Sequence, residues 1–252
     1  MTAEQMSRQS LTTEELVARA SPLIGSIGGA FYFHPDTVAR GRELELGGLR
    51  FYFLGRGGVL GDVEPGVITS AFGYFEPGLV AKLWTSATEK LAPREAGREY
   101  LECARAFART HFGRLDGLDA YCRAAEAVND ATDATSLALY AGLDAEPLCD
   151  DVAGRAMQLT MLLREYRGSA HLAAVRCCGL APAVAHAIKR PDDVATFGYD
   201  APPPITDADR AAHARAETLT DEMVSDAFAV LDATGGADLL AGLEAMTTAL
   251  AG

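Results

Sequence analysis

Two arginines stand at matching places in the chain, and their chemistry suits the binding of an anion. Arg56 precedes Gly57 at the end of the apolar run GGLRFYFLGRGG, and Arg167 precedes Gly168 at the end of MQLTMLLREYRGS. The guanidinium group presents a planar fork of N–H donors that fits a carboxylate or a phosphate. If the two segments face each other, both arginines could hold one anionic group. Alternatively, each arginine pairs with an acidic side chain of its own segment.

His171 is the candidate for acid–base catalysis. It lies two residues after Ser169, a residue type favoured at the N-cap, so we expect His171 in the first turn of a helix. The helix dipole disfavours a protonated imidazole there, and a neutral imidazole suits a hydrogen-bond partner, a metal ligand or a general base. The alternative is a structural histidine that is bonded to a nearby carboxylate.

Three polar residues near the C-terminus are spaced for one helix face. Glu217, Thr220 and Asp221 follow the i, i+3, i+4 pattern. They could pair with Arg56, Arg167 or His171, and we expect at least one such contact. A contact of this kind is compatible with a structural as well as a functional role.

Aromatic side chains are concentrated in the N-terminal third of the chain. His34, Phe72, Tyr74 and Trp84 are the candidates there for lining a ligand site. An apolar pocket with a few polar groups is typical of small-molecule sites. The alternative is that these rings fill the hydrophobic core.

Motifs for metals, nucleotides and serine nucleophiles are absent. No His-x-x-x-His or His-Glu-x-x-His pattern occurs, so no metal site is predicted, although ligands can converge from distant segments. The glycine-rich GRGGVLG at residues 55–61 does not follow a clear strand, and no Gly-x-Ser-x-Gly elbow is present. The cofactor is therefore unknown, and whether the protein is an enzyme stays open.

The segments that carry these residues indicate an internal repeat in the sequence. ITSAFGYFEPGLVAKL (68–83) and AAVRCCGLAPAVAHAI (173–188) are each a small-residue helix, a turn, an x-Pro pair and a second amphipathic segment. Pro77 and Pro182 lie 105 positions apart, and proline is favoured in the first turn of a helix. The pattern predicts two copies of one unit, at about residues 15–88 and 136–190.

The predicted fold is mostly α, with tandem, pseudo-twofold, winged helix-turn-helix-like units and extra helices. Residues 89–135 are helical by pattern, 190–207 read as a proline-rich loop, and the tail reads as two helices broken at Gly235-Gly236. We expect a first unit at 1–135 and a second unit with acidic C-terminal helices at 136–252, packed as one globular body.

Three segments carry a family resemblance. YFLGRGGVLGDVEPGVITSAFGYFEPGLVAKLW, REYRGSAHLAAVRCCGLAPA and AETLTDEMVSDAFAVLDATG resemble the EvbL-type helix-turn-helix family of actinobacteria. The resemblance implies a helix-turn-helix fold, and the family's DNA-binding label rests mainly on fold similarity. Family members usually continue with a Trp-containing reading helix and a short wing. Here KRPDDVATFGYDAPPP stands in that place, and PPPITDADR is what is left of the wing.

Composition narrows the function classes. The 252 residues are 49% hydrophobic and 23% charged, as in ordinary globular proteins. The formal net charge of −13 argues against broad binding to phosphate backbones, although residues 160–190 carry a local charge of +4. No apolar run approaches the roughly 18 residues that span a bilayer. The N-terminus lacks an apolar signal core, and the five cysteines form no CxxC pair, so we expect a reducing cytoplasm and no membrane contact.

The leading functional interpretation is a repurposed helix-turn-helix fold. A small, anionic or aromatic molecule would bind in the cleft between the repeats, with Arg56, Arg167 and His171 as polar contacts and catalysis left open. The alternative is a DNA-binding transcriptional regulator. It is disfavoured because the reading segments APAVAHAI and EPGLVAKLW offer few side chains that contact bases. A homodimer is compatible with the sequence, and a third interpretation is an interaction protein whose acidic tail meets a basic partner.

Overall fold

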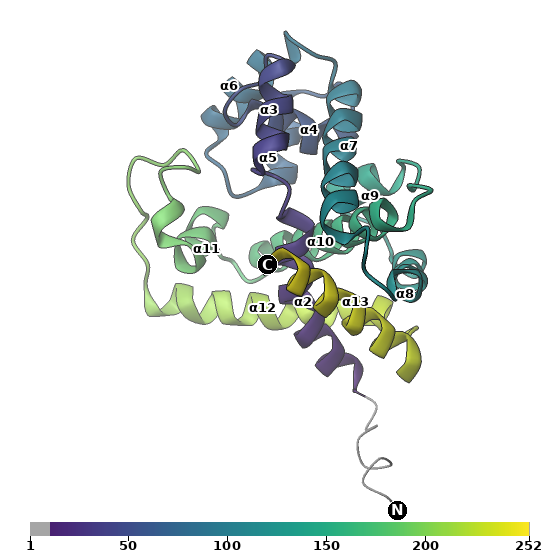
Figure 1. Ribbon diagram of the computed structural model, residues 1–252. Helices are drawn as coiled ribbons and strands as arrows, with labels where there is room; N and C mark the ends of the chain where they lie inside the picture. The colour runs from purple at the N-terminus through teal and green to yellow at the C-terminus, as the bar shows by residue number, and fades with distance from the viewer. Residues whose placement is uncertain (1–10, 252) are drawn as a thin grey trace, which may run out of the picture.

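The computed structural model describes residues 11–251, which consist of helices joined by turns and loops. The first ten residues of the N-terminal segment interpreted above lie outside the described range. The described residues form α-helices, two 3-10 turns and no strand, which confirms the predicted mostly α fold (Figure 1). The helices are α2 (Thr13–Gly29), α3 (Pro35–Glu43), α4 (Arg50–Gly57), α5 (Pro65–Phe72), α6 (Pro77–Thr88), α7 (Pro93–Phe112), α8 (Leu118–Asp130), α9 (Ala138–Asp144), α10 (Val152–Cys177), α11 (Pro182–Lys189), α12 (Asp207–Phe228) and α13 (Ala233–Ala251); the 3-10 turns are η1 (Gly58–Leu60) and η2 (Pro191–Asp193).

The first helix pair consists of α5 and α6. Between them Gly73 adopts a left-handed conformation with φ of 68°, which glycine tolerates without strain. Pro77 opens α6, where its missing N–H is not needed. A β-carbon on Gly73 would lie 2.4 Å from the Leu172 side chain, so this turn packs directly on α10.

The end of α10 and α11 form a second helix pair. Gly179 has a φ of 73°, Pro182 opens α11, and the two helices are bent by 116°. Such a bend lies in the range of helix-turn-helix units. At the same offset of 105 positions that separates Pro77 from Pro182, Phe75 matches Leu180 and Val80 matches Ala185, and all four are buried. Leu83 and Ile188, the third such pair, are half-buried.

Helix α10 organises the core. It packs against α2, α7, α8 and α12, and Figure 1 shows it in the middle of the molecule, with α3 to α6 at one end and α12 at the other. Residues 156–163 of α10 are buried without interruption, as expected of a helix surrounded by other helices. One large hydrophobic cluster extends from Leu16 to Met246. A smaller cluster of short side chains joins α10, α11 and α12: Ala174, Val175, Leu180, Ala185, Ala212 and Ala216.

Two predicted helix boundaries are wrong. Helix α10 continues through Arg167, Gly168 and Ser169, so no helix starts at Ser169. A single glycine costs only about 1 kcal/mol in a helix, and burial of the flanking residues on the core side offsets that cost. The tail breaks at residues 229–232 instead of at Gly235-Gly236, because the Asp232 carboxylate accepts a hydrogen bond from the Gly235 N–H at the start of α13.

The predicted wing is also absent from the part of the chain that the structure describes. Residues 202–206 form a loop, and α12 begins at Asp207 behind a capping box formed by Thr206 and Asp209. No single described helix is long and apolar enough to cross a membrane; only the bent pair of α10 and α11 meets the test for length and composition.

Candidate functional site

A bidentate ion pair joins the two halves of the chain. Arg56, near the end of α4, donates from Nε to Oε1 of Glu165 at 2.8 Å and from Nη2 to Oε2 at 2.7 Å. Glu165 lies in the middle of α10 and its side chain is 5% exposed, against 15% for Arg56. Two parallel charge-assisted bonds fix both groups, and the pair links α4 to α10.

Three further polar groups complete the buried cluster, which consists of Tyr32, Tyr52, Arg56, Arg164 and Glu165. Tyr52 accepts from Arg56 Nη1 at 3.0 Å. Tyr32 accepts from Arg164 Nη1 at 2.9 Å and donates to Glu165 Oε1 at 3.3 Å. Burial alone would raise the pKa of Glu165, but the charges and hydrogen bonds of Arg56 and Arg164 lower it to about 2. The cluster therefore holds two cations and one carboxylate, with a net charge of +1.

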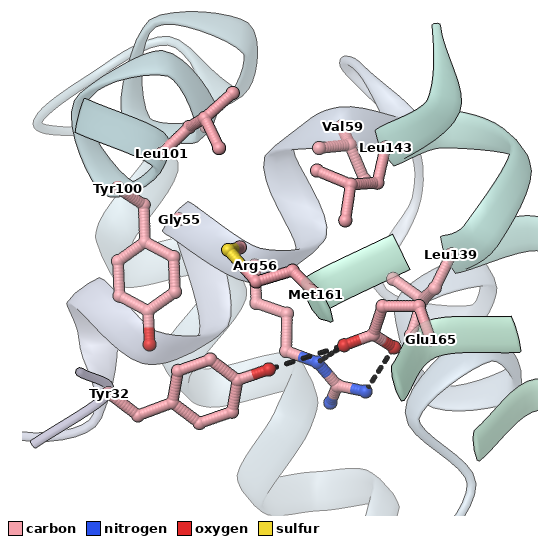
Figure 2. A pocket seen from close by; sticks show the side chains of 11 residues that line it. Tyr32, Gly55, Arg56, Val59, Tyr100, Leu101, Leu139, Leu143, Met161 and Glu165 are labelled. Atoms are coloured by element: carbon pink, nitrogen blue, oxygen red, sulfur yellow. Dashed lines mark hydrogen bonds and ion pairs between the residues drawn. The ribbon is translucent and has the colours of Figure 1, made fainter. Parts of the chain in front are cut away.

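A small cavity lies beside the Arg56–Glu165 pair (Figure 2). Its walls come from both halves of the chain: Tyr32, Gly55, Arg56, Val59, Gly97, Tyr100, Leu101, Leu139, Leu143, Met161 and Glu165. The cavity has room for a single water molecule, whose centre can occupy a volume of about 20 Å³. The hydroxyl of Tyr100 is buried without a hydrogen-bond partner among the described residues.

A second group, the α12 cluster, surrounds Glu217. It consists of Arg167, His171, Lys189, His213, Glu217, Thr220 and Asp221. Arg167 Nη2 lies 3.1 Å from Glu217 Oε2 and 2.8 Å from Asp221 Oδ1, while Lys189 Nζ lies 3.0 Å from Glu217 Oε1. Burial would raise the pKa of Glu217, but Lys189, His171 and Arg167 lower it to about 2. The predicted contact between this helix face and Arg167 is thus present.

His171 belongs to the α12 cluster through Thr220. Its Nδ1 lies 2.8 Å from Thr220 Oγ1, a contact between two residues that the sequence analysis singled out. His171 lies in the C-terminal part of α10, six residues before its last residue Cys177, so the argument from the positive dipole at a helix start does not apply. Burial, with the nearby cations Lys189 and Arg167, instead lowers the pKa of His171 to about 4, so the ring is neutral at neutral pH.

The two predicted arginines do not meet. Arg56 and Arg167 pair with different carboxylates, and Arg164, not Arg167, shares Glu165 with Arg56. The partner of Arg56 comes from the other half of the chain, not from its own segment. His171 and Arg167 are not among the residues that line the cavity, so the predicted grouping of His171 with Arg56 does not form.

The predicted ligand-lining residues Phe72, Trp84, His34 and Tyr74 do not lie around one common site. Phe72 lies beneath Arg56, with the guanidinium carbon 4.6 Å from the ring centre. Trp84 is buried in the core and donates to the Val63 carbonyl at 2.9 Å. His34 caps α3 and packs against Phe107. Tyr74 lies close to His171, with ring centres 6.4 Å apart, and its buried hydroxyl has no partner among the described residues.

Comparison with known proteins identifies the fold family. Residues 17–201 match a helix-turn-helix family, a span that includes both helix pairs and the whole buried cluster. The chain belongs to this helix-turn-helix family. No curated protein and no solved structure matches it.

In a helix-turn-helix protein that reads DNA, the N-terminal end of the second helix approaches the bases. In α6 that end carries the Glu76 carboxylate, which accepts from the N–H groups of Gly78 at 2.8 Å and Leu79 at 2.7 Å. The loop after α11 also packs there, since Glu76 N donates to the Phe197 carbonyl at 2.8 Å. A phosphate group would meet a negative charge and a covered helix end.

Phe197 also connects the two helix pairs of this helix-turn-helix protein. Its ring stacks on Phe75 at 4.0 Å and on His186 of α11 at 3.6 Å between ring centres. The loop that replaces the expected reading helix therefore fixes the first helix pair to the second.

Sequence reasoning missed Glu165, Tyr52 and His213. A signal for Glu165 was present, because it is the only acidic residue between positions 160 and 190. No comparable signal marked Tyr52. His213 stands four residues before Glu217, the spacing of neighbours on a helix face, but its other neighbour His171 is on a different helix.

Proposed function

We propose that this helix-turn-helix protein binds a small anionic molecule with an apolar body in the cavity beside Arg56. The observation that carries the proposal is the Tyr100 hydroxyl, which is buried without a partner among the described residues, on a residue that lines the cavity together with Arg56 and Glu165. Buried polar groups are nearly always hydrogen-bonded, so this hydroxyl calls for a partner.

The chemistry of the walls defines the ligand class. Arg56 has five N–H donors, and its three nitrogens each make one bond to the protein, so two N–H groups remain for an anion. Val59, Leu101, Leu139, Leu143 and Met161 supply an apolar wall. A ligand larger than water needs an outward movement of α9, the seven-residue helix that contributes Leu139 and Leu143.

The first test is native mass spectrometry of the freshly purified protein beside its denatured mass. We expect a non-covalent additional mass in the native spectrum of the wild type. A Tyr100→Phe variant removes only the unpartnered hydroxyl and should lose this mass. The matched control is Tyr121→Phe, because the Tyr121 hydroxyl is equally buried but already bonds Thr160.

If the wild type retains nothing, thermal unfolding with a panel of aromatic and aliphatic carboxylates replaces that readout. A bound ligand raises the melting temperature of the wild type and of Tyr121→Phe more than that of Tyr100→Phe. Equal shifts in all three proteins, or no shift with any compound, would contradict binding at this cavity.

Family membership favours one second candidate, DNA binding. Lys82 on α6 and Arg176 on α10 are exposed, as a reader of DNA requires. Against it stand the net charge of −13 and the covered start of α6. Fluorescence anisotropy with random duplex DNA at increasing salt should show weak binding that Lys82→Ala leaves unchanged. Tight binding that falls steeply with salt would replace the ligand proposal.

Two finer assignments belong to the same proposal. Membership of the EvbL-type group of actinobacteria rests on the three sequence segments quoted above. A reducing cytoplasm as the compartment is supported by the cysteines, since all five are free thiols.

A further inference from the structure

We propose that His171, His213 and Glu217 form a binding site for a divalent transition-metal ion of the zinc class. One ligand atom from each of the three side chains lies within 4.8 Å of the other two. Two imidazoles and one carboxylate are a donor set that zinc prefers, with a fourth position left for water or a substrate. This proposal is independent of the cavity beside Arg56 and uses different residues.

The distances between the ligand atoms are close to what a metal ion needs. His171 Nε2 and His213 Nε2 lie 3.8 Å and 3.9 Å from Glu217 Oε1. These separations are too long for hydrogen bonds. Ligand atoms at zinc-bond length in a tetrahedral site are about 3.4 Å apart, so each side chain would move by less than about 1 Å.

The hydrogen bonds around His171 prepare its Nε2 as a ligand. The Thr220 hydroxyl donates to the Ala216 carbonyl at 2.6 Å, so its single hydrogen is used. Thr220 Oγ1 must therefore accept from Nδ1–H of His171, 2.8 Å away. That tautomer leaves a lone pair on Nε2, on the side of the ring that faces Glu217. Metal-binding histidines are usually oriented by such a bond from the other ring nitrogen.

Unpartnered polar atoms mark the same place. His213 Nε2, Arg167 Nε and the Tyr74 hydroxyl are all buried without a hydrogen-bond partner among the described residues. The ring of His213 lies 6.1 Å from that of His171, and the ring of Tyr74 lies 6.4 Å from it. Buried groups of this kind are rare, and a group of them indicates an ion or a water network.

Lys189 now holds the position that a cation would take. Its ammonium group lies 3.0 Å from Glu217 Oε1, the oxygen that faces both histidines, and its side chain is 55% exposed. Such a flexible side chain can turn to solvent when a metal ion binds. Arg167 can stay on Oε2, so the carboxylate keeps its orientation.

The test is isothermal titration of untagged, chelator-treated protein with ZnCl2. We expect one Zn²⁺ per chain in the wild type, and binding weakened by more than about 100-fold in His171→Gln and in His213→Gln, since even loss of an outer hydrogen-bond partner costs about 10- to 100-fold. The matched control is His111→Gln, which removes a histidine on α7 and should bind as the wild type does.

Two further variants keep the test decisive if a histidine variant fails to fold. Lys189→Met removes the competing ammonium group at an exposed position and should bind Zn²⁺ more tightly than the wild type. Thr220→Val keeps the side-chain shape but removes the acceptor for His171 Nδ1, and should weaken binding about 10-fold. Binding of Co²⁺ with the strong visible absorption of a four-coordinate site supports the assignment.

The proposal is overturned if the wild type binds no Zn²⁺. It is equally overturned if His171→Gln and His213→Gln bind as the wild type does, or if Lys189→Met binds more weakly.

Discussion

The buried cluster and the α12 cluster each place cationic side chains around one glutamate. They differ in how many of their polar atoms have a hydrogen-bond partner. In the buried cluster, both oxygens of Glu165 receive arginine donors, and Figure 2 shows the bonds of Arg56 and Tyr32 to this carboxylate. Tyr52 accepts a further bond from Arg56. In the α12 cluster, Glu217 also receives two cations, but His213 Nε2 and Arg167 Nε remain without a partner in the described range. The first arrangement links α4 to α10 and has its unpartnered hydroxyl outside the cluster, on Tyr100, whereas the second has unpartnered atoms within the cluster itself.

The position of each Arg-Gly pair within its helix explains why the two arginines make different contacts. Arg56-Gly57 ends α4, and the Arg56 side chain extends to Glu165 on α10 while its guanidinium group lies over Phe72 of α5. Arg167-Gly168 lies inside α10, and the arginine reaches sideways to α12 at the surface. The same dipeptide thus serves a core contact in one place and a half-exposed contact in the other.

The largest expected effect comes from removing one charge of the buried pair. Glu165→Gln leaves the Arg56 guanidinium buried without a counter-ion, which costs about 3–5 kcal/mol of unfolding free energy. Glu217→Gln removes a carboxylate that is 29% exposed and should cost about 1 kcal/mol. Urea unfolding of both variants beside the wild type measures the two losses.

The double variant Arg56→Met/Glu165→Met is the control for that interpretation. It leaves Arg164, whose side chain is 27% exposed, as the only charge of the cluster, whereas Glu165→Gln leaves two cations, so the double variant should lose less stability than Glu165→Gln alone. Equal losses in Glu165→Gln and Glu217→Gln would show that the buried pair is not the more important one, and the comparison between the clusters would then fail.

Lowering the pH should reduce the difference in unfolding free energy between the wild type and Glu165→Gln. The pKa of Glu165 in the folded protein is about 2, below its ordinary value of 4.5. The stability that the charged carboxylate contributes is therefore complete above about pH 4.5 and is lost as the pH falls toward about 2. Glu217 and the other acids titrate in both proteins, so their effects cancel in the difference.

Unfolding free energies measured from neutral pH down to about pH 3 test this dependence. We expect a constant difference between the two proteins above the ordinary glutamate range and a shrinking difference below it. A difference that stays constant across the whole range would mean that folding leaves the pKa of Glu165 unchanged.

Local signals made the helix pairs predictable, while the partner of Arg56 depended on tertiary packing. Pro77 and Pro182, each after a turn glycine, mark their helix starts within a few residues of sequence. The pairing of Arg167 with Glu217 and Asp221 could be anticipated from charge and helical spacing. The partner of Arg56 is 109 positions away on a helix whose continuity the sequence pattern concealed, because Arg167-Gly168-Ser169 resembles a helix boundary.

The surroundings of His171 also depended on tertiary packing that the sequence pattern did not reveal. Its neutral state was predicted from a helix start that does not exist, and burial against α12 is the actual cause. The same neutral state is therefore expected here from burial and not from the helix dipole. The grouping of His171 with His213 and Glu217 was not predicted, because His213 and Glu217 lie on α12 while His171 lies on α10, and only the packing of the two helices brings the three together.

Conservative replacement of the two arginines should also affect the two clusters unequally. Arg56 makes two parallel bonds to Glu165, a third to Tyr52, and lies over Phe72. A lysine supplies one ammonium group and cannot reproduce this fork, so Arg56→Lys should cost about 2 kcal/mol.

Arg167 contacts both Glu217 and Asp221 through a single nitrogen, Nη2, and a lysine ammonium can take that place. Arg167→Lys should therefore cost less than about 1 kcal/mol, which thermal or urea unfolding resolves beside Arg56→Lys. If Arg167→Lys were the more damaging variant, its unpartnered Nε would have to carry a bond that the contacts described here do not include. The polar atoms of the α12 cluster would then be bonded as fully as those of the Arg56–Glu165 pair, and its three metal-ligand candidates would lose their freedom to move together.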